Sequence, residues 1–376
     1  MNVMTRRSEP SRPSGQTVLV LQGGGALGAY QAGVYQGLSE AGIEPDWVIG
    51  TSIGAINAAI IAGNKPADRL DRLKDFWDRV QTRSSLKMPW LSMFGNAFAN
   101  LGVLTQGVPG FFQPNPAALW GMHYPAGPGL AAYYGTDPLK STLADLIDVE
   151  RLNSQDMRAT VGAVNVGTGE MRYFDNRDMR LDIAHVMASG ALPPAFPAIE
   201  IEGEQYWDGG LVSNTPLDWV VESQPHFDTL AFQVDLWSAR GELPSTLVEV
   251  STRQKEIQYS SRTRASTNSF RRIQRLRRIM ADLLDKLPEE LGRSSEAVQL
   301  RKVADRKVYN IVHLNYHPKN YEGNAKDYEF SRRSMEDHWR AGYYDAVRTL
   351  RHPEVLEQPA NQEGVFTFDL AVDGRE

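Results

Sequence analysis

Two glycine-containing turns near the start of the chain carry residue types suited to acyl transfer. Ser52 lies in Gly50-Thr51-Ser52-Ile53-Gly54, a G-x-S-x-G pattern. Between a strand and a helix, this pattern forms a sharp turn that exposes the serine hydroxyl, and glycines let strand and helix approach closely. A serine at a helix start also lies near unsatisfied N–H groups, which favour the negative charge of an attacked ester carbonyl. Ser52 is therefore the candidate nucleophile, with Gly50 and Gly54 as the glycines of the turn.

The run Gly23-Gly24-Gly25-Ala26-Leu27-Gly28 has three interpretations. Its spacing matches a dinucleotide-binding loop, which requires an acidic residue about 20 positions later, at the end of the next strand. Glu44 and Asp46 precede that strand instead, which disfavours a nucleotide. Alternatively, successive glycine N–H groups converge on one point and form an oxyanion hole, with Gly23, Gly24, Gly25 and Gly28 as candidates. The third interpretation is a tight turn that binds nothing.

A carboxylate that could act as the base occurs in Asp208-Gly209-Gly210, directly after a predicted pair of short strands over 198–207. Asp-Gly alone is more typical of a plain turn. A free aspartate, with a pKa of about 3.9, is also a weak base for a serine hydroxyl. Burial that raises its pKa, together with a hydrogen bond to the serine, makes the role feasible.

Histidine offers a rival base, as in a Ser-His-Asp triad. Among the seven histidines, His185, His313 and His317 are the candidates. His185 lies on a predicted helix and is expected to be packed or to cap that helix rather than to act as a base.

The elements around these turns predict a three-layer α/β/α fold with a mostly parallel central sheet. Apolar runs at 18–21 and 47–49 are typical of buried strands, and helices are expected at 29–38 and 55–62. Further helices are predicted at 66–80, 137–147, 181–189 and 331–350. A hairpin is predicted over 160–166 and 171–175, and further strands at 229–237 and 307–314.

Residues 88–136 contain no Asp, Glu, Lys or Arg but nine aromatic residues. Polar residues and prolines interrupt the segment, so it lacks the uninterrupted apolar run of about 20 residues that a membrane span needs. Two interpretations remain open: a buried irregular insertion, or an apolar cap over Ser52 that forms an acyl-chain pocket or a membrane-facing lid.

Composition limits the possible partners. With 376 residues, the chain has room for one large or two ordinary domains. Its net charge of −6 disfavours general nucleic-acid binding. The absence of cysteine excludes disulfides and thiolate metal sites. Residues 1–16 are polar and lack the apolar segment of a signal peptide, so we expect a flexible tail and a cytoplasmic protein. No cofactor or metal is expected, and the oligomeric state is left open.

A basic stretch over 253–280 stands out from this acidic background. Residues 253–278 hold nine Lys or Arg residues against one acid, Glu256. An apolar stripe at three- and four-residue steps predicts one amphipathic helix: Ile273, Leu276, Met280, Leu283 and Leu287. The stripe either packs against the protein, or the helix attracts an anionic bilayer or an acidic partner. We hypothesise peripheral contact with the inner membrane surface.

Taken together, the motifs resemble the patatin-like phospholipase family. The glycine loop at 23–28, G-x-S-x-G at 50–54 and Asp-Gly-Gly at 208–210 occur in the family's order, and the stretch ASGALPPAFP at 188–197 is similar to a family block. The resemblance covers about residues 17–225, the expected catalytic domain, and residues 226–376 resemble the C-terminal extension of some bacterial members. Leu27 stands where many members carry a basic residue.

The resemblance implies a serine–aspartate dyad. Ser52 would be the nucleophile, Asp208 its base, Gly23 to Gly28 the oxyanion loop, and Gly209 and Gly210 motif glycines. The implied activity is hydrolysis of acyl ester bonds of lipids, as in a phospholipase A. A general carboxylesterase acting on small or polymeric hydroxyacyl esters, and a catalytically silent lipid-binding scaffold, are the alternatives.

Overall fold

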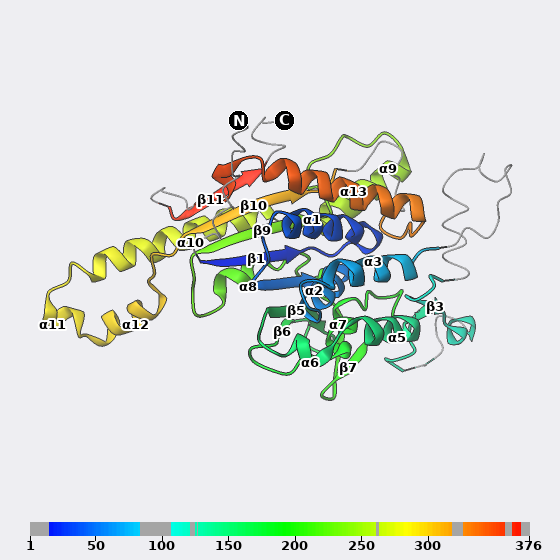
Figure 1. Cartoon of the computed structure of the whole chain (residues 1–376). Coiled ribbons are helices and arrows are strands. Elements are labelled where there is room, and N and C mark those ends of the chain that lie inside the picture. Colours follow the sequence, from blue (N-terminus) through cyan, green and yellow to red (C-terminus); the bar gives the residue numbers. More distant parts are fainter. Residues whose placement is uncertain are drawn as a thin grey trace, which may run out of the picture.

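The computed structural model describes residues 15–82, 107–120, 125, 127–260, 263–317, 326–357 and 363–369. Helices and strands alternate along most of this chain (Figure 1). The strands are β1 Gln16–Leu21, β2 Trp47–Thr51, β3 Gln113–Pro114, β4 Tyr134–Gly135, β5 Arg158–Asn165, β6 Met171–Asp175, β7 Ile199–Ile201, β8 Glu204–Asp208, β9 Thr229–Asp235, β10 Tyr309–Asn315 and β11 Val365–Asp369.

The helices predicted at 29–38, 55–62, 66–80, 137–147, 181–189 and 331–350 are confirmed, with ends shifted by a few residues. The α-helices are α1 Gly28–Glu40, α2 Ile53–Ala62, α3 Arg69–Arg79, α5 Asp137–Leu146, α6 Val149–Leu152, α7 Ile183–Ser189, α8 Leu217–Glu222, α9 Leu247–Tyr259, α10 Thr263–Leu284, α11 Glu289–Gly292, α12 Ser295–Val303 and α13 Arg332–Thr349. Short 3-10 helices are η1 Gly25–Leu27, η3 Pro116–Trp120, η4 Gly209–Leu211 and η5 Pro353–Val355.

The main sheet is mostly parallel, as predicted. Its strand order is β11-β10-β9-β1-β2-β5-β8-β7, with β6 paired to β5. The strands from β11 to β5 in this order pair in parallel, whereas β6, β7 and β8 pair antiparallel. Because β9, β10 and β11 continue the same sheet beside β1, the region after residue 225 shares the sheet with the region before it.

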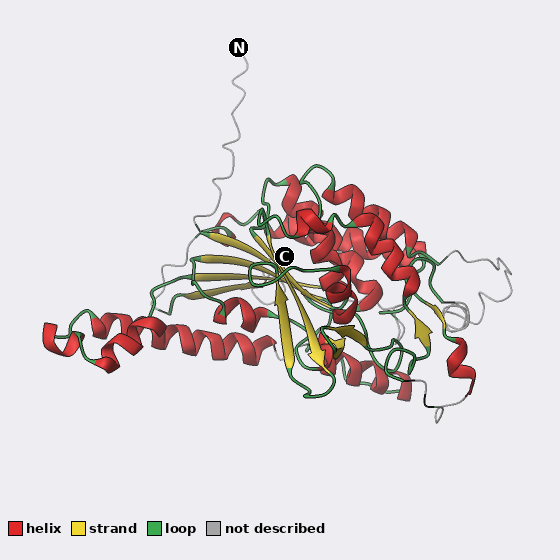
Figure 2. Cartoon of the chain, turned by 90° about the horizontal axis from the view of Figure 1, so that it is seen from below, coloured by secondary structure: helices red, strands yellow, loops and turns green. Residues whose placement is uncertain are grey.

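Alternation along β1 shows how helices cover both faces of the sheet. Leu19 and Leu21 join one buried cluster, which also contains apolar residues of α1, α2 and α13. Val18 and Val20 join a second cluster with residues of α8 and α10. Since successive strand residues point to opposite faces, these two clusters are the two interfaces of a three-layer α/β/α fold (Figure 2).

The predicted basic helix over 253–280 is wrong as a single element, because α9 ends at Tyr259 and α10 begins at Thr263. The carbonyl of Tyr259 instead accepts hydrogen bonds from the side chains of Gln22 and Asn214, at 3.2 and 2.8 Å. These bonds occupy the carbonyl that a continuing helix would use.

The stripe predicted along this helix is mostly solvent-exposed rather than packed, with Met280 and Leu287 half-buried. Ile273, Leu276 and Leu283 are 44%, 55% and 56% exposed. The neighbouring face of α10 is the buried one, through Phe270, Gln274, Arg277, Ala281 and Leu284. Arg277 donates to the carbonyl of Val221 at 3.2 Å. Polar side chains thus determine which face of α10 packs against the protein, and apolar periodicity does not reveal this face.

The apolar insertion lies partly outside the described residues, which omit 88–106, 121–124 and 126. In the described part, Phe111 and Phe112 are buried, and their rings pack against Phe196. This part therefore contributes to the core, as one of the two interpretations expected. Of the predicted N-terminal tail, residues 1–14 lie outside the described part, and β1 begins at Gln16.

Candidate active site

Ser52 occupies a strained turn between β2 and α2. Its φ of 57° lies in the left-handed region that non-glycine residues rarely adopt. The turn is tight: a Cβ on Gly50 would lie 2.3 Å from the carbonyl oxygen of Gly54, and one on Gly54 would lie 2.2 Å from the carbonyl oxygen of Leu21. Only glycine fits at these two positions, which is the close approach that the G-x-S-x-G pattern predicted.

Sheet topology brings Asp208 to this turn. β2 pairs along one edge of β5, and this pairing ends where Thr51 lies beside Gly162. β6 pairs along the other edge of β5. β8 therefore takes over the edge that β2 leaves, and its last residue, Asp208, pairs with Ala163. The residues at the two strand ends, Thr51 and Asp208, thus pair with consecutive residues of β5.

Asp208 is a buried carboxyl group, 2% exposed. Burial raises its pKa to about 6, while hydrogen bonds to the Ser52 side chain and the Gly210 amide oppose the shift. The Gly210 amide donates to Oδ1 at 2.7 Å. No cationic side chain among the described residues contributes to this shift. The group is therefore a stronger base than a free aspartate and meets no neutralising cation.

In the glycine loop, two amides donate to carbonyls outside the loop. The amide of Gly23 donates to the carbonyl of Asn214 at 3.2 Å, and that of Ala26 donates to the carbonyl of Asp327 at 2.7 Å. Gly28 begins α1, and a Cβ there would lie 2.5 Å from the side chain of Ile53. Gly24 and Gly25 remain as loop amides without a protein acceptor in the described chain.

Three side chains that support the turns were not singled out from the sequence. Ser189 accepts a hydrogen bond from the Ser52 amide at 3.0 Å and donates to the carbonyl of Gly162 at 2.6 Å. Asn214 donates to the carbonyl of Gly23 at 3.1 Å, and Gln31 donates to that of Gln22 at 2.6 Å. Ser189 lies within the ASGALPPAFP block, but polar residues that bond to the main chain have no periodic signature in a sequence.

The outer side of the glycine loop is held by residues after position 225. A Cβ on Gly25, whose φ is 56°, would lie 2.1 Å from the carbonyl oxygen of Asp327. The side chain of Asp327 pairs with Lys255 of α9, whose Nζ lies 2.6 Å from both carboxylate oxygens. Trp237 donates from its indole to the carbonyl of Gly23 at 2.9 Å. The loop is thus enclosed from both halves of the chain.

The histidines lie elsewhere in the fold. His185 accepts from the Asp182 amide at 2.9 Å in a capping box at the start of α7, the capping role that the sequence predicted. Burial lowers its pKa. His313, on β10, lies 3.9 Å from Asp235, and β9 and β1 separate its strand from β2. His226 bonds to Asp305 at 2.6 Å, but it precedes β9 and so lies at the opposite end of the sheet from Ser52.

Exposed apolar side chains occur on two segments that contact the site. Leu211 and Val212, directly after Asp208-Gly209-Gly210, are 42% and 55% exposed. Leu247 and Ile257 of α9 are 89% and 59% exposed. The described residues hold no group of three or more His, Asp or Glu side chains placed to bind a metal. Across the same residues, no helix has the length and apolar character needed to cross a bilayer.

Comparisons with known proteins give a family match over more than half of the chain. A family model described as "Patatin-like phospholipase" matches residues 19–221, and one described as "Patatin phospholipase" matches residues 257–362.

Curated relatives match over shorter stretches. "Patatin-like phospholipase domain-containing protein 6" of Mus musculus is 40% identical over 92 residues, which is 23% of this chain and 7% of that protein. "Lysophospholipase nte1" of Aspergillus terreus is 59% identical over 44 residues, which is 12% of this chain and 3% of that protein. The chain thus spans only a small part of these relatives' length. Among solved structures, VipD from Legionella pneumophila is similar with a TM-score of 0.42 and 14% identity, covering 96% of this chain and 72% of that chain.

Proposed function

Because the chain belongs to the patatin-like phospholipase family, we propose that it hydrolyses acyl ester bonds of lipids with Ser52 as nucleophile and Asp208 as base. One observation carries the proposal. The strand ends beside Ser52 and Asp208 pair with consecutive residues of β5, and burial raises the pKa of the Asp208 carboxyl to about 6, a shift that the Ser52 side chain opposes. Such a group is still ionised at neutral pH and accepts a proton more readily than an exposed aspartate does.

In the proposed first half-reaction, the Ser52 hydroxyl oxygen attacks the ester carbonyl carbon while its proton passes to Asp208. The carbonyl oxygen becomes an oxyanion and accepts hydrogen bonds from the amides of Gly24 and Gly25. The tetrahedral intermediate collapses to an acyl ester on Ser52, and the leaving alcohol takes the proton from Asp208.

Water completes the proposed cycle. It attacks the acyl carbonyl and gives a proton to Asp208, the same two amides hold the second oxyanion, and the carboxylic acid departs. The proton on Asp208 returns to the Ser52 oxygen, which restores the starting state. Each half-reaction therefore transfers one proton to Asp208 and returns it.

We propose that the lipid surface meets the protein at the carboxyl end of the sheet. The exposed apolar side chains Leu211, Val212, Leu247 and Ile257 belong to segments that adjoin the dyad and the glycine loop. An apolar rim around a reactive serine suits a substrate presented in an aggregate or bilayer. The substrate headgroup and the cleaved position are left to experiment.

Hydrolysis assays with paired esters test this proposal. We expect 4-nitrophenyl esters to be hydrolysed by the wild-type chain, and Ser52→Ala to lower kcat/KM by about 10⁴-fold. Ser295→Ala, a serine substitution on α12 far from the dyad, is the matched control and should keep full activity. Absence of hydrolysis by both wild type and Ser52→Ala would favour the silent scaffold.

Substrate comparison separates the two enzyme proposals. Higher kcat/KM on long acyl chains in phospholipid vesicles favours a lipid acyl hydrolase, and a preference for short soluble or polymeric hydroxyacyl esters favours the carboxylesterase. Replacing His185, His313 or His317 by alanine should leave a soluble-ester activity of the same order. An alanine variant as inactive as Ser52→Ala would point to a triad instead.

A further inference from the structure

The helices α10, α11 and α12 form an arm that projects from the body of the molecule in both views (Figures 1 and 2). α10 has 22 residues, so at 1.5 Å per residue it is about 33 Å long. α12 packs back on α10, with Ala281, Leu284 and Ala297 buried. The arm is therefore a helical hairpin with its own small contact between helices.

One face of α10 carries an apolar stripe that the described residues leave uncovered. Ile273, Leu276, Ile279 and Leu283 recur at three- and four-residue steps and are 44%, 55%, 52% and 56% exposed. Side chains at this spacing share one helix face. A contiguous exposed apolar face on an otherwise ordinary surface is typical of an interaction site.

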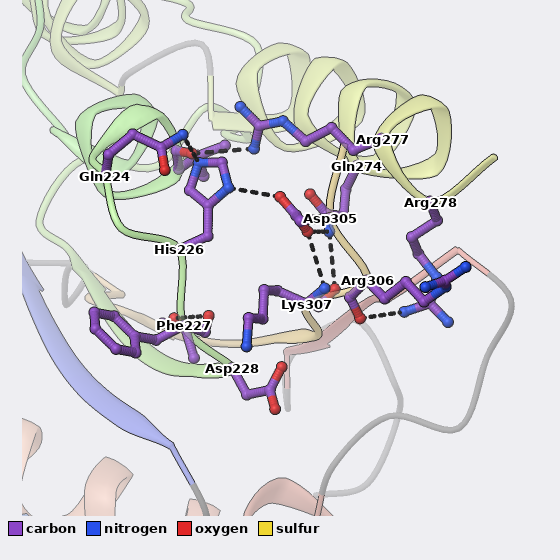
Figure 3. A network of polar contacts seen from close by, with 12 residues as sticks. Gln224, His226, Phe227, Asp228, Gln274, Arg277, Arg278, Asp305, Arg306 and Lys307 are labelled. Atoms are coloured by element: carbon purple, nitrogen blue, oxygen red, sulfur yellow. Dashed lines mark hydrogen bonds and ion pairs between the residues drawn. The ribbon is translucent and has the colours of Figure 1, made fainter. Parts of the chain in front are cut away.

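A polar network holds the base of the arm firmly to the sheet (Figure 3). Asp305 accepts from the Gln274 side chain at 2.7 Å and from the Lys307 amide at 2.9 Å, and it bonds to His226. Arg278 donates to the carbonyl of Arg306 at 2.9 Å. With its base fixed at two points along α10, the stripe is presented in one orientation.

The arm lies at the end of the sheet that is remote from Ser52. Its base contacts residues 305–307, which come just before β10, whereas Ser52 follows the carboxyl end of β2. Strands of seven residues separate these two ends by about 20 Å. A bilayer on the stripe would therefore not deliver lipid to the dyad, which favours a different occupant.

We propose that the stripe packs against the same stripe of a second copy of this chain, with the two α10 helices antiparallel about a two-fold axis near Ile279. In that arrangement Leu276 of one copy meets Leu283 of the other, and the reverse. In a two-fold interface, both copies use the same surface patch, so the patch must be complementary to itself. A stripe centred on the axis meets this requirement.

Charge along the flank of the stripe supports this occupant. Arg275 and Asp282 are seven residues apart, so they lie on the same side of α10, one on each side of Ile279. Antiparallel pairing places each Arg275 beside the Asp282 of the other copy. Arg275 has no acidic partner among the described residues, and Asp282 accepts from Arg306 at 2.9 Å in an exposed contact.

Sedimentation velocity over a concentration series tests the proposal on the full chain. We expect a mass of two chains for wild type and of one chain for Leu276→Glu, with Leu243→Glu as the control at the other end of the sheet, where Leu243 is 95% exposed. Arg275→Asp and Asp282→Arg should each weaken dimerisation by about 10-fold. The double variant should restore it, because antiparallel pairing exchanges the two charges.

Circular dichroism and hydrolysis of a soluble ester verify that each variant is folded, since the dyad lies at the opposite end of the sheet. A wild-type chain that sediments as one copy at every concentration would overturn the proposal. So would a Leu276→Glu dimer, a double variant that stays monomeric, or a Leu276→Glu variant that loses only binding to anionic vesicles.

Discussion

The two ends of the central sheet place their carboxyl groups in different surroundings. At the carboxyl end, Asp208 is 2% exposed and accepts from the Gly210 amide at 2.7 Å, and no cation among the described residues acts on its pKa. At the amino end, Asp305 bonds to His226, to the Gln274 side chain and to the Lys307 amide. The first carboxylate is held with a raised pKa, and the second has its acceptor oxygens occupied by donors.

The candidate nucleophile at the carboxyl end also has a strained backbone conformation. Ser52 and Gly25, at the carboxyl end, have φ values of 57° and 56°. A strained turn and an uncompensated charge both cost stability, and such costs gather where a site must be preorganised. Under the proposed function, the carboxyl end is the reactive end of the sheet, and the polar network at the amino end has a structural role. Substitutions at the two ends should therefore affect different measurements.

Asp208→Asn should give the largest effect, lowering activity while raising stability. Without a base, kcat/KM on a soluble ester should fall by about 10³-fold or more. Stability should rise at pH 8, because removing a carboxylate whose pKa is raised from 3.8 to about 6 relieves a cost of about 2–3 kcal/mol, at about 1.4 kcal/mol per pKa unit. Ester hydrolysis and urea unfolding measure the two quantities. An Asp208→Asn variant that is both active and less stable than wild type would contradict the proposed difference between the two ends of the sheet.

Asp305→Ala should show the opposite split. Losing this acceptor leaves three buried or half-buried donors unpaired and should lower the free energy of unfolding by about 2–4 kcal/mol. Activity on a soluble ester should be unchanged. Asp285→Ala removes an exposed carboxylate that pairs with Arg306 and is the matched control, with an expected change below about 1 kcal/mol. Equal destabilisation by the two variants would deny the network its role.

pH should move activity and stability in opposite directions at the reactive end. The proposed base must be ionised, so kcat/KM should be level above pH 6 and fall about ten-fold per unit below it. A carboxyl with a raised pKa binds its proton more tightly when folded, so its contribution to stability falls as pH rises from about 4 to about 6. The Asp208→Asn variant should lack this fall. A pH–rate profile without an inflection near 6 would contradict the assignment.

Lys255→Met should give the smallest effect and connect the two halves of the chain. Lys255 opposes the burial that raises the pKa of Asp327, whose carbonyl accepts from the Ala26 amide of the glycine loop. Loosening this support should lower kcat by about 5–10-fold with KM unchanged, since the oxyanion is bound only in the transition state. Lys255→Arg should restore most of the loss, and Lys74→Met, on the surface of α3, should change nothing. A Lys255→Met variant with wild-type kcat would show that the glycine loop does not need this support.

Much of the fold could be predicted from local patterns. Apolar runs located β1 and β2, and turn glycines at 50 and 54 predicted the close approach that the structure contains. The position of Asp208 could not be derived from spacing, because it depends on β8 replacing β2 along the edge of β5. Only the resemblance to a known family connected residues 52 and 208 in advance.

The misjudged region shows the limit of apolar periodicity. Apolar periodicity predicted the stripe of α10 but not that the stripe is exposed. Gln274 and Arg277, on the adjacent face, form hydrogen bonds that hold that face against the body of the protein. It also missed the break after Tyr259, where side chains from distant segments take the helix carbonyl. Both outcomes were decided by residues far apart in sequence, so no local window contains the information.

Labelling with a fluorophosphonate followed by mass spectrometry tests the proposed dyad most directly. The reagent phosphonylates an activated serine hydroxyl and needs neither the natural lipid nor a second assay. We expect one adduct on the peptide that contains Ser52, formed more slowly in Asp208→Asn and absent in Ser52→Ala. An adduct on another serine, or labelling of Ser52 at an unchanged rate without Asp208, would contradict the proposal.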